Sequence, residues 1–122
     1  MPSVIGVRGS LFYQAKKGGD SVPTPTVQPK FPLGQLVMSR GVADLVASNA
    51  AFAKCCTDSL YRHGSGDWGD LSAKDKRENN YALQLGNMRI FSAYEFPHGL
   101  PRIWIITEAD RSATTTLFPE EY

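Results

Sequence analysis

The most constraining feature of the sequence is the apolar segment Ile103-Trp104-Ile105-Ile106. Because every position is apolar, both faces of a strand formed here must be covered, whereas an edge or surface strand alternates apolar with polar residues. Arg102 and Glu108 bracket the segment at its two solvent-facing ends. We therefore expect a central strand of a sheet that is covered by a helix.

Turn signals around this segment divide the C-terminal half of the chain into an antiparallel meander. Gly86-Asn87 predicts a first turn after Leu83-Gln84-Leu85, residues 96–101 predict a second, and residues 109–111 a third. Thr114-Thr115-Thr116 strongly favours a strand. The expected strands are therefore 81–85, 88–95, 102–108 and 112–118.

Upstream of the meander the apolar pattern is mostly helical. Residues 35–38 predict a short strand, and apolar residues then recur at helical spacing, interrupted by the cap-forming pair Ser48-Asn49. This pattern predicts helices near 42–47 and 50–62. The capping-box spacing that begins at Ser72 predicts a polar helix of about two turns, ending near residues 79–80. The expected fold class is α+β, with short helices packed on a C-terminal four-stranded antiparallel β-meander.

The first 32 residues predict an extended N-terminal arm. Val4-Ile5-Gly6-Val7 and Leu11-Phe12-Tyr13 are candidates for short strands, but four prolines follow within residues 23–32. Proline fixes φ and disfavours helix at the preceding residue, so residues 21–32 indicate an extended linker. We expect residues 1–32 to form a flexible or strap-like arm and residues 33–122 to form a single domain.

Composition and charge narrow the classes of function. A chain of 122 residues with a net charge of +1 is neither an acidic DNA mimic nor a strongly basic nucleic-acid binder, which argues against direct nucleic-acid binding. The two cysteines, Cys55 and Cys56, are adjacent and suit a reducing compartment. The sequence contains no signal-peptide pattern and no apolar run of membrane-spanning length. We expect a cytoplasmic protein without a membrane segment; its oligomeric state cannot be read from the sequence.

The glycine-rich segment Gly66-Asp67-Trp68-Gly69-Asp70 is the first candidate binding site. An exposed Trp68 on such a loop would serve as an interface anchor, with Asp67 and Asp70 accepting hydrogen bonds from a partner. In the alternative interpretation Trp68 folds back into the core and Asp67 caps the turn, as tryptophan is usually well buried.

A second candidate is the turn that holds Glu108, Asp110 and Arg111. Two carboxylates beside an arginine could contact a partner, bind a divalent cation or carry out acid–base chemistry. In the alternative interpretation Asp110 forms an Asx-turn and Arg111 pairs with Glu108. Both interpretations remain open from the sequence.

His63 and His98 could converge with Asp67 and Glu108 on one metal-binding or general-base site. A helix-terminal His63 is also favoured by the helix dipole without any function. Zinc spacings, nucleophile motifs and phosphate-binding glycine loops are absent from the sequence. We therefore expect no cofactor and no metal.

Several motifs together resemble an uncharacterised family of small proteins from plasmids and other mobile elements of Gram-negative bacteria. The resemblance spans about residues 31–122 and rests on these residues: His63, Gly66-Asp67-Trp68-Gly69, Glu78-Asn79, Trp104 to Ser112, Thr114-Thr115 and Pro119-Glu120-Glu121-Tyr122. Such proteins are often labelled methylation subunits of type I restriction enzymes. The sequence has neither the cofactor turn nor the [DNS]-P-P-[YF] tetrapeptide that amino-methyl transfer requires.

The resemblance implies that the gene lies among other genes of mobile elements, and such genes frequently encode inhibitors of host defence. We therefore expect a non-enzymatic module that binds a protein or nucleoprotein defence complex, acting as an anti-CRISPR or anti-restriction inhibitor. The alternative is a small metal-dependent hydrolase or nuclease that uses His63, Asp67, Glu108 and Asp110. A converged cluster of these four residues would favour the alternative.

Overall fold

The computed structural model describes residues 4–6 and 29–122. Residues 4–6 are described by backbone alone. Most of the expected arm, including Leu11-Phe12-Tyr13 and much of the proline-rich linker, lies outside the described residues. Within them, Phe31 is buried in the core, with 6% of its surface exposed, immediately before the expected domain begins.

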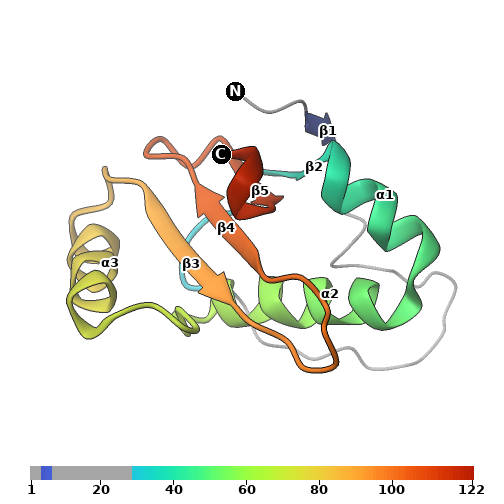
Figure 1. Ribbon diagram of the computed structural model, residues 1–122. Coiled ribbons are helices and arrows are strands. Elements are labelled where there is room, and N and C mark those ends of the chain that lie inside the picture. Colours follow the sequence, from blue (N-terminus) through green and yellow to red (C-terminus); the bar gives the residue numbers. More distant parts are fainter. Residues whose placement is uncertain (1–3, 7–28) are drawn as a thin grey trace, which may run out of the picture.

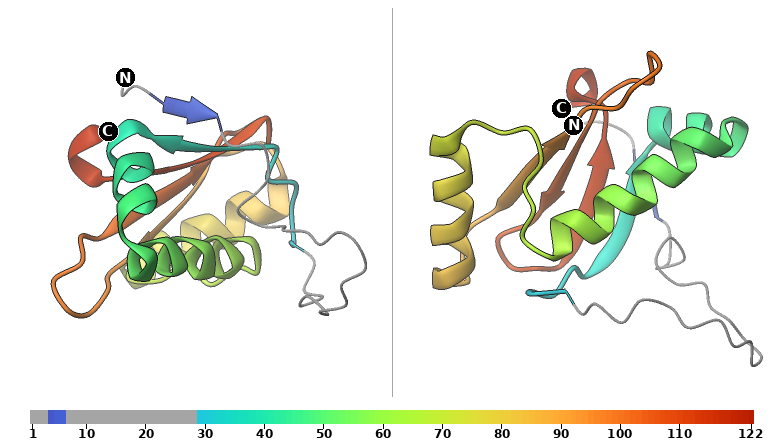
Figure 2. Two further views of the ribbon diagram at one scale, coloured as in Figure 1. Left: turned by 90° about the vertical axis from the view of Figure 1, so that its right-hand side faces the viewer. Right: turned by 90° about the horizontal axis from the view of Figure 1, so that it is seen from below.

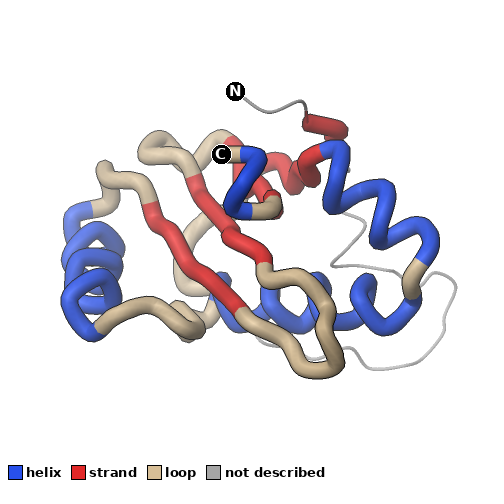
Figure 3. Tube along the Cα trace, in the orientation of Figure 1, coloured by secondary structure: helices blue, strands red, loops and turns tan. Residues whose placement is uncertain are grey.

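The elements follow in the order β1 (Val4–Gly6), β2 (Gln35–Ser39), α1 (Arg40–Ser48), α2 (Ala50–Gly64), α3 (Ala73–Leu85), β3 (Ile90–Tyr94), β4 (Ile103–Thr107), β5 (Ala113–Leu117) and the 3₁₀ turn η1 (Pro119–Glu121) (Figure 3). The five strands form one mixed sheet in the order β1-β2-β5-β4-β3. The α+β class is therefore confirmed.

The helix starts follow from local hydrogen bonding, which the sequence predicted for the second and third helices. The Ser39 side chain caps α1, and the Oδ1 atom of Asn49 accepts the Phe52 N–H at 2.9 Å to start α2. The Ser72 hydroxyl accepts the Asp75 N–H at 3.1 Å to start α3. These caps confirm two consecutive helices broken at Asn49 and a third helix that begins after Ser72.

The sheet corrects the expected pure antiparallel meander. β3, β4 and β5 do pair antiparallel, but β2 joins β5 in parallel, with Val37 opposite Thr115. A parallel pair cannot be joined by a tight turn. The three helices and two strands that separate β2 from β5 in the sequence provide the long connection.

The first expected meander strand, residues 81–85, is instead the last turn of α3. Gly86 adopts φ of +78°, and its N–H donates to the carbonyl oxygen of Ala82. A left-handed glycine directly after the final turn is the usual way to end a helix, so Gly86 serves as a helix cap and not as a hairpin turn. Helix-favouring alanine, leucine and glutamine in this turn point the same way.

One face of the sheet forms the core with α2. The inward apolar side chains of β4 are Ile103 and Ile105, both fully buried, and α2 contributes Phe52 and Leu60 from its apolar face. Figure 1 and Figure 2 show α2 running along the sheet, with α1 at the β2 side and α3 beyond β3. The apolar strand is therefore internal and covered by a helix on one face.

The opposite face of the sheet is built from the alternate residues of the same strands. There Trp104 is half-buried and packs against Phe91 on β3 and Tyr122 at the C-terminal turn, with ring centroids 5.0 and 5.7 Å apart. The second face of the apolar strand is thus covered by aromatic side chains and not by a helix of the described chain.

The exposed edge of β3 is covered by groups from outside the sheet. The side-chain amide of Asn79 on α3 donates to the Phe91 carbonyl oxygen at 2.5 Å and accepts the Phe91 N–H at 3.1 Å. Ala93 is the next residue of β3 whose backbone groups point away from β4, and its carbonyl oxygen accepts the Asp70 N–H at 2.7 Å. Occupied edge groups cannot pair with another strand, so α3 and the loop before it block this edge.

Replacing Asn79 by Ala should lower the free energy of unfolding by about 2–3 kcal/mol, because both backbone groups of Phe91 lose their partner. Chemical denaturation of the two proteins measures the difference. Gln84→Ala, on an exposed position of the same helix, is the matched control and should change stability by less than about 0.5 kcal/mol. Equal effects of the two substitutions would contradict the edge-capping role.

Candidate functional site

The loop between α2 and α3 places Trp68 inside the protein, with 3% of its surface exposed. Its ring lies 6.2 Å from that of Phe31 and 5.8 Å from that of His63. The indole N–H donates to Oδ1 of Asn80 at 2.9 Å, which satisfies its polar group. The interpretation of Trp68 as an exposed interface anchor is therefore wrong, and the alternative, a tryptophan folded back into the core, is correct.

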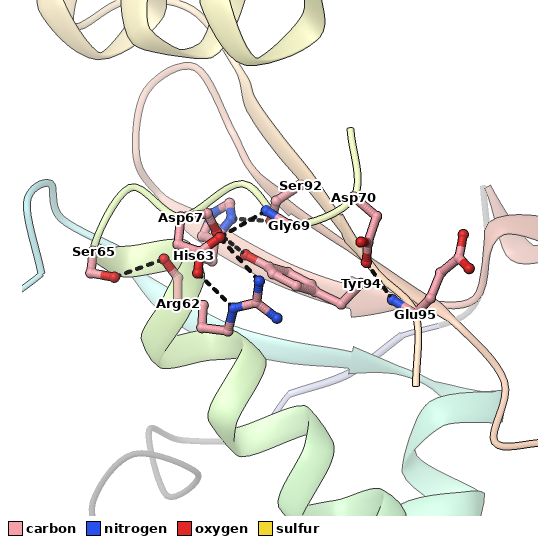
Figure 4. Close-up of polar contacts among 9 residues, drawn as sticks. All are labelled: Arg62, His63, Ser65, Asp67, Gly69, Asp70, Ser92, Tyr94 and Glu95. Atoms are coloured by element: carbon pink, nitrogen blue, oxygen red, sulfur yellow. Dashed lines mark hydrogen bonds and ion pairs between the residues drawn. The ribbon is translucent and has the colours of Figure 1, made fainter. Parts of the chain in front are cut away.

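Asp67 uses both carboxylate oxygens inside the protein. Oδ2 accepts from Nε of Arg62 at 2.7 Å, while Oδ1 accepts from Nη2 of Arg62 at 3.1 Å and from the Gly69 N–H at 3.1 Å. The Arg62 hydrogen bond holds the pKa of Asp67 below its ordinary value. The same guanidinium lies 4.8 Å from the centre of the Tyr94 ring, and the Tyr94 hydroxyl donates to the Asp67 carbonyl at 2.7 Å (Figure 4). Asp67 therefore fixes the turn.

Asp70 ties the same loop to β3. Its Oδ2 atom accepts the Glu95 N–H at 2.8 Å. The loop comes close enough for this contact only because residue 69 is glycine. Gly69 has φ of +72°, and a Cβ atom there would lie 2.1 Å from the Ala93 carbonyl oxygen. Asp70 and Gly69 thus anchor the loop on the sheet edge.

The turn between β4 and β5 also uses its polar groups locally. Oδ1 of Asp110 accepts the Ser112 N–H at 3.0 Å, which is an Asx-turn, and hydrogen bonding from Ser112 lowers the Asp110 pKa. Arg111 has φ of +63°, and its Nη1 donates to the carbonyls of Met88 at 2.7 Å and Ala109 at 3.0 Å. The arginine therefore fastens the turn to the segment before β3. Its contact with Glu108 is to the backbone carbonyl, at 3.2 Å, and not to the carboxylate.

His63, near the end of α2, is fully buried and bonded at both ring nitrogens. Nδ1 lies 2.6 Å from Oγ of Ser92, and Nε2 lies 2.9 Å from Oγ1 of Thr107. The Thr107 hydroxyl lies 2.7 Å from that of Thr114, which donates to the carbonyl oxygen of Leu33 at 2.7 Å. One chain of hydrogen bonds therefore joins α2, three strands and the segment before β2.

The direction of this chain follows from its last member. A carbonyl oxygen only accepts, so the single hydroxyl proton of Thr114 is committed to Leu33, and Thr107 must donate to Thr114. The oxygen of Thr107 then accepts from Nε2–H of His63, and Nδ1 accepts from Ser92. Every group is satisfied only when His63 is the neutral Nε2–H tautomer.

Burial lowers the pKa of His63 from 6.5 to about 3, because the imidazolium would lose its hydration inside the core. His63 is accordingly a structural histidine at neutral pH.

The four residues of the hydrolase alternative do not assemble into one site. His63 has no free nitrogen, Asp67 is paired with Arg62, and Asp110 holds its own turn. Within the ranges 4–6 and 29–122, no three His, Cys, Asp or Glu side chains are grouped so that they could hold a metal ion. His98 is exposed in the loop between β3 and β4, with φ of +62°.

Sequence reasoning missed the polar groups that organise the core, namely Ser92, Thr107 and Thr114 beside His63. A signal for them exists. Ser92 lies between the buried Ile90 and Tyr94 on one side of β3, and Thr107 lies on the same side of β4 as the buried Ile105. Thr114 is the buried residue opposite Thr107 in the sheet. A polar residue at an inward position must find a buried partner, and a histidine is one of the few that can bond two strands at once.

No protein-family model matches the chain, and comparisons with curated proteins and with solved structures also found no significant match. None of the helices in the described part of the chain is long and apolar enough to cross a membrane.

Acidification should destabilise the protein through His63. The folded pKa lies below the unfolded value, so between about pH 6.5 and 3 the unfolded chain binds the extra proton, and stability is lost as pH falls. We expect the free energy of unfolding to drop by roughly 2–3 kcal/mol between pH 7 and 4.5. Urea denaturation across this range measures it.

His63→Gln should flatten this pH dependence, although it will also lower stability at pH 7. His98→Asn is the matched control, since asparagine tolerates the left-handed backbone of residue 98, and it should retain the parental slope. A parental slope in His63→Gln would show that other groups cause the pH dependence.

Proposed function

We propose that the protein is a non-enzymatic binding module of a mobile element that docks on a protein or nucleoprotein complex of a host defence system. The observation that carries the proposal is the distribution of side chains. The candidate catalytic groups Asp67, Asp110 and His63 are bonded within the fold, whereas large apolar side chains remain exposed. These are Tyr81, Leu85, Met88 and Tyr122, between 41% and 62% exposed.

Exposed aromatic and methionine side chains are characteristic of protein interfaces. Inhibition by docking needs contact area and no chemistry, which suits a chain whose polar groups hold the fold. Inhibition of a defence system, by an anti-CRISPR or anti-restriction action, is supported by the resemblance to mobile-element proteins. The candidate binding residues Asp67, Asp70, Glu108, Asp110 and Arg111 would contribute to this docking mainly by holding the two loops in place.

A titration of a CRISPR effector or a restriction nuclease, with this protein limiting, tests the proposal. Inhibition should be stoichiometric, with each protein molecule inactivating no more than one complex. Protein that has been treated with a chelator and dialysed should inhibit equally well. Several complexes inactivated by each protein molecule would overturn the proposal and favour an enzyme.

Replacing Glu108 by Gln and Asp110 by Asn together should leave the inhibitory potency within about twofold, because removing side chains outside an anchor changes binding little. Asn keeps the Asx-turn that Asp110 makes with Ser112, so the turn is preserved. A loss of inhibition by a variant with an unchanged melting temperature would instead support the hydrolase or nuclease alternative.

A further inference from the structure

An array of aromatic rings lies on the sheet face opposite the His63 core. Phe91 and Trp104 meet edge to face at 5.0 Å, and Tyr122 lies against Trp104 at 5.7 Å. Met88, which is 41% exposed, immediately precedes Arg89 at the entry to β3. We name these five residues, Met88, Arg89, Phe91, Trp104 and Tyr122, the Arg89 surface.

Tyr122 is held in place from two sides. Nη1 of Arg89 donates to the Tyr122 hydroxyl at 2.6 Å, and the guanidinium lies 5.9 Å from the centre of the ring. The preceding Glu121 fixes the C-terminal turn, since its carboxylate accepts the N–H groups of Gly41 and Phe118, both at 2.9 Å, and the Ser39 hydroxyl. The ring is therefore positioned before any partner arrives, although 62% of Tyr122 is exposed.

Arg89 is exposed and has no acidic partner among the described residues. This distinguishes it from Arg62 and Arg102, which pair with Asp67 and Glu95. A guanidinium has five N–H donors in a planar fork, and the Tyr122 hydroxyl takes one of them. The remaining donors match the geometry of a carboxylate, which would bind with two parallel hydrogen bonds.

We infer that the Arg89 surface binds an acidic, apolar segment of a protein partner. A carboxylate of the segment pairs with Arg89, and a neighbouring apolar side chain lies on Tyr122 and Met88. The inference rests on the proposed function, since it identifies the surface that such a module uses for docking. A protein is favoured over nucleic acid because the chain carries a net charge of only +1 and phosphate binding requires many positive charges.

The two tryptophans of the chain provide the readout. The Trp104 indole lies on the Arg89 surface, whereas the buried Trp68 indole is bonded to Asn80 and serves as an internal reference. The probe is a capped hexapeptide of alternating aspartate and leucine, titrated to about 5 mM because single contacts of this kind bind weakly. The control peptide replaces each aspartate by asparagine.

We expect the Trp104 indole NMR signal to shift saturably with the aspartate peptide while the Trp68 signal stays fixed. Arg89→Gln should raise the dissociation constant at least about tenfold, as loss of a charge-assisted bidentate pair does. Arg77→Gln, at an exposed arginine on α3, is the matched control and should leave the constant unchanged. Melting curves of both variants check the fold.

Three outcomes would overturn the inference. They are no Trp104 shift up to the highest peptide concentration, equal binding of the asparagine peptide, and unchanged affinity in Arg89→Gln. A Trp104 shift produced by a single-stranded oligothymidylate of about ten nucleotides, and not by the peptide, would instead assign the surface to nucleic acid. The experiment contains no defence complex, so its failure is distinct from a failure of the stoichiometric titration.

Discussion

The fold depends on the hydrogen-bond chain that passes through His63. This one side chain links α2 to β3 through Ser92 and to β4 through Thr107, and Thr114 carries the chain across β5 to Leu33. Hydrogen bonds in such a core must all be made, because each unpaired buried group costs about 1–3 kcal/mol. Apolar packing supplies the driving force for burial, and the polar chain selects one placement of the helix on the sheet.

The placement of His63 also determines where the neighbouring loop can run. Phe31 and Trp68 pack edge to face with the imidazole, with ring centroids 5.5 and 5.8 Å from its own. With Trp68 committed to the core, the flanking Asp67 and Asp70 reach back to Arg62 and to the start of the β3–β4 loop. The sequence of this glycine-rich loop is typical of a binding loop, but in the structure the loop covers the core and blocks a sheet edge.

The sequence was most informative where structure is decided by a few neighbouring residues. The breaks at Asn49 and Ser72 follow from side chains that bond the backbone within three residues, and the uninterrupted apolar run of residues 103–106 indicates a strand inside the sheet. The last turn of α3 was misjudged because Gly86 suits both a hairpin and a helix end. Neighbouring residues alone could not distinguish the two, and the packing of Asn79 against Phe91 favours the helix.

Contacts between residues far apart in the sequence determine the parallel placement of β2. They also determine whether the candidate binding residues face the core or the solvent. Thr114 and Leu33 are 81 positions apart, and nothing local to either segment specifies their meeting. The same applies to Trp68, whose burial requires Phe31, His63 and Asn80 from three separate segments. Patterns of residue type could identify these side chains as important, but whether they face a partner or the core depends on the complete fold.

The two faces of the sheet should therefore differ in how well they tolerate amino-acid substitutions. A substitution on the His63 face must preserve both volume and hydrogen bonding, since Ser92, Thr107 and Thr114 are all buried. On the opposite face Ile106 and Leu117 are buried, whereas Trp104 is half-buried and Tyr122 is mostly exposed. The exposed positions of this face, such as Tyr122, can therefore vary with less effect on the fold. For the docking that we propose, this face is available for specificity, because alternation along a strand lets one residue serve the core and its neighbour serve binding.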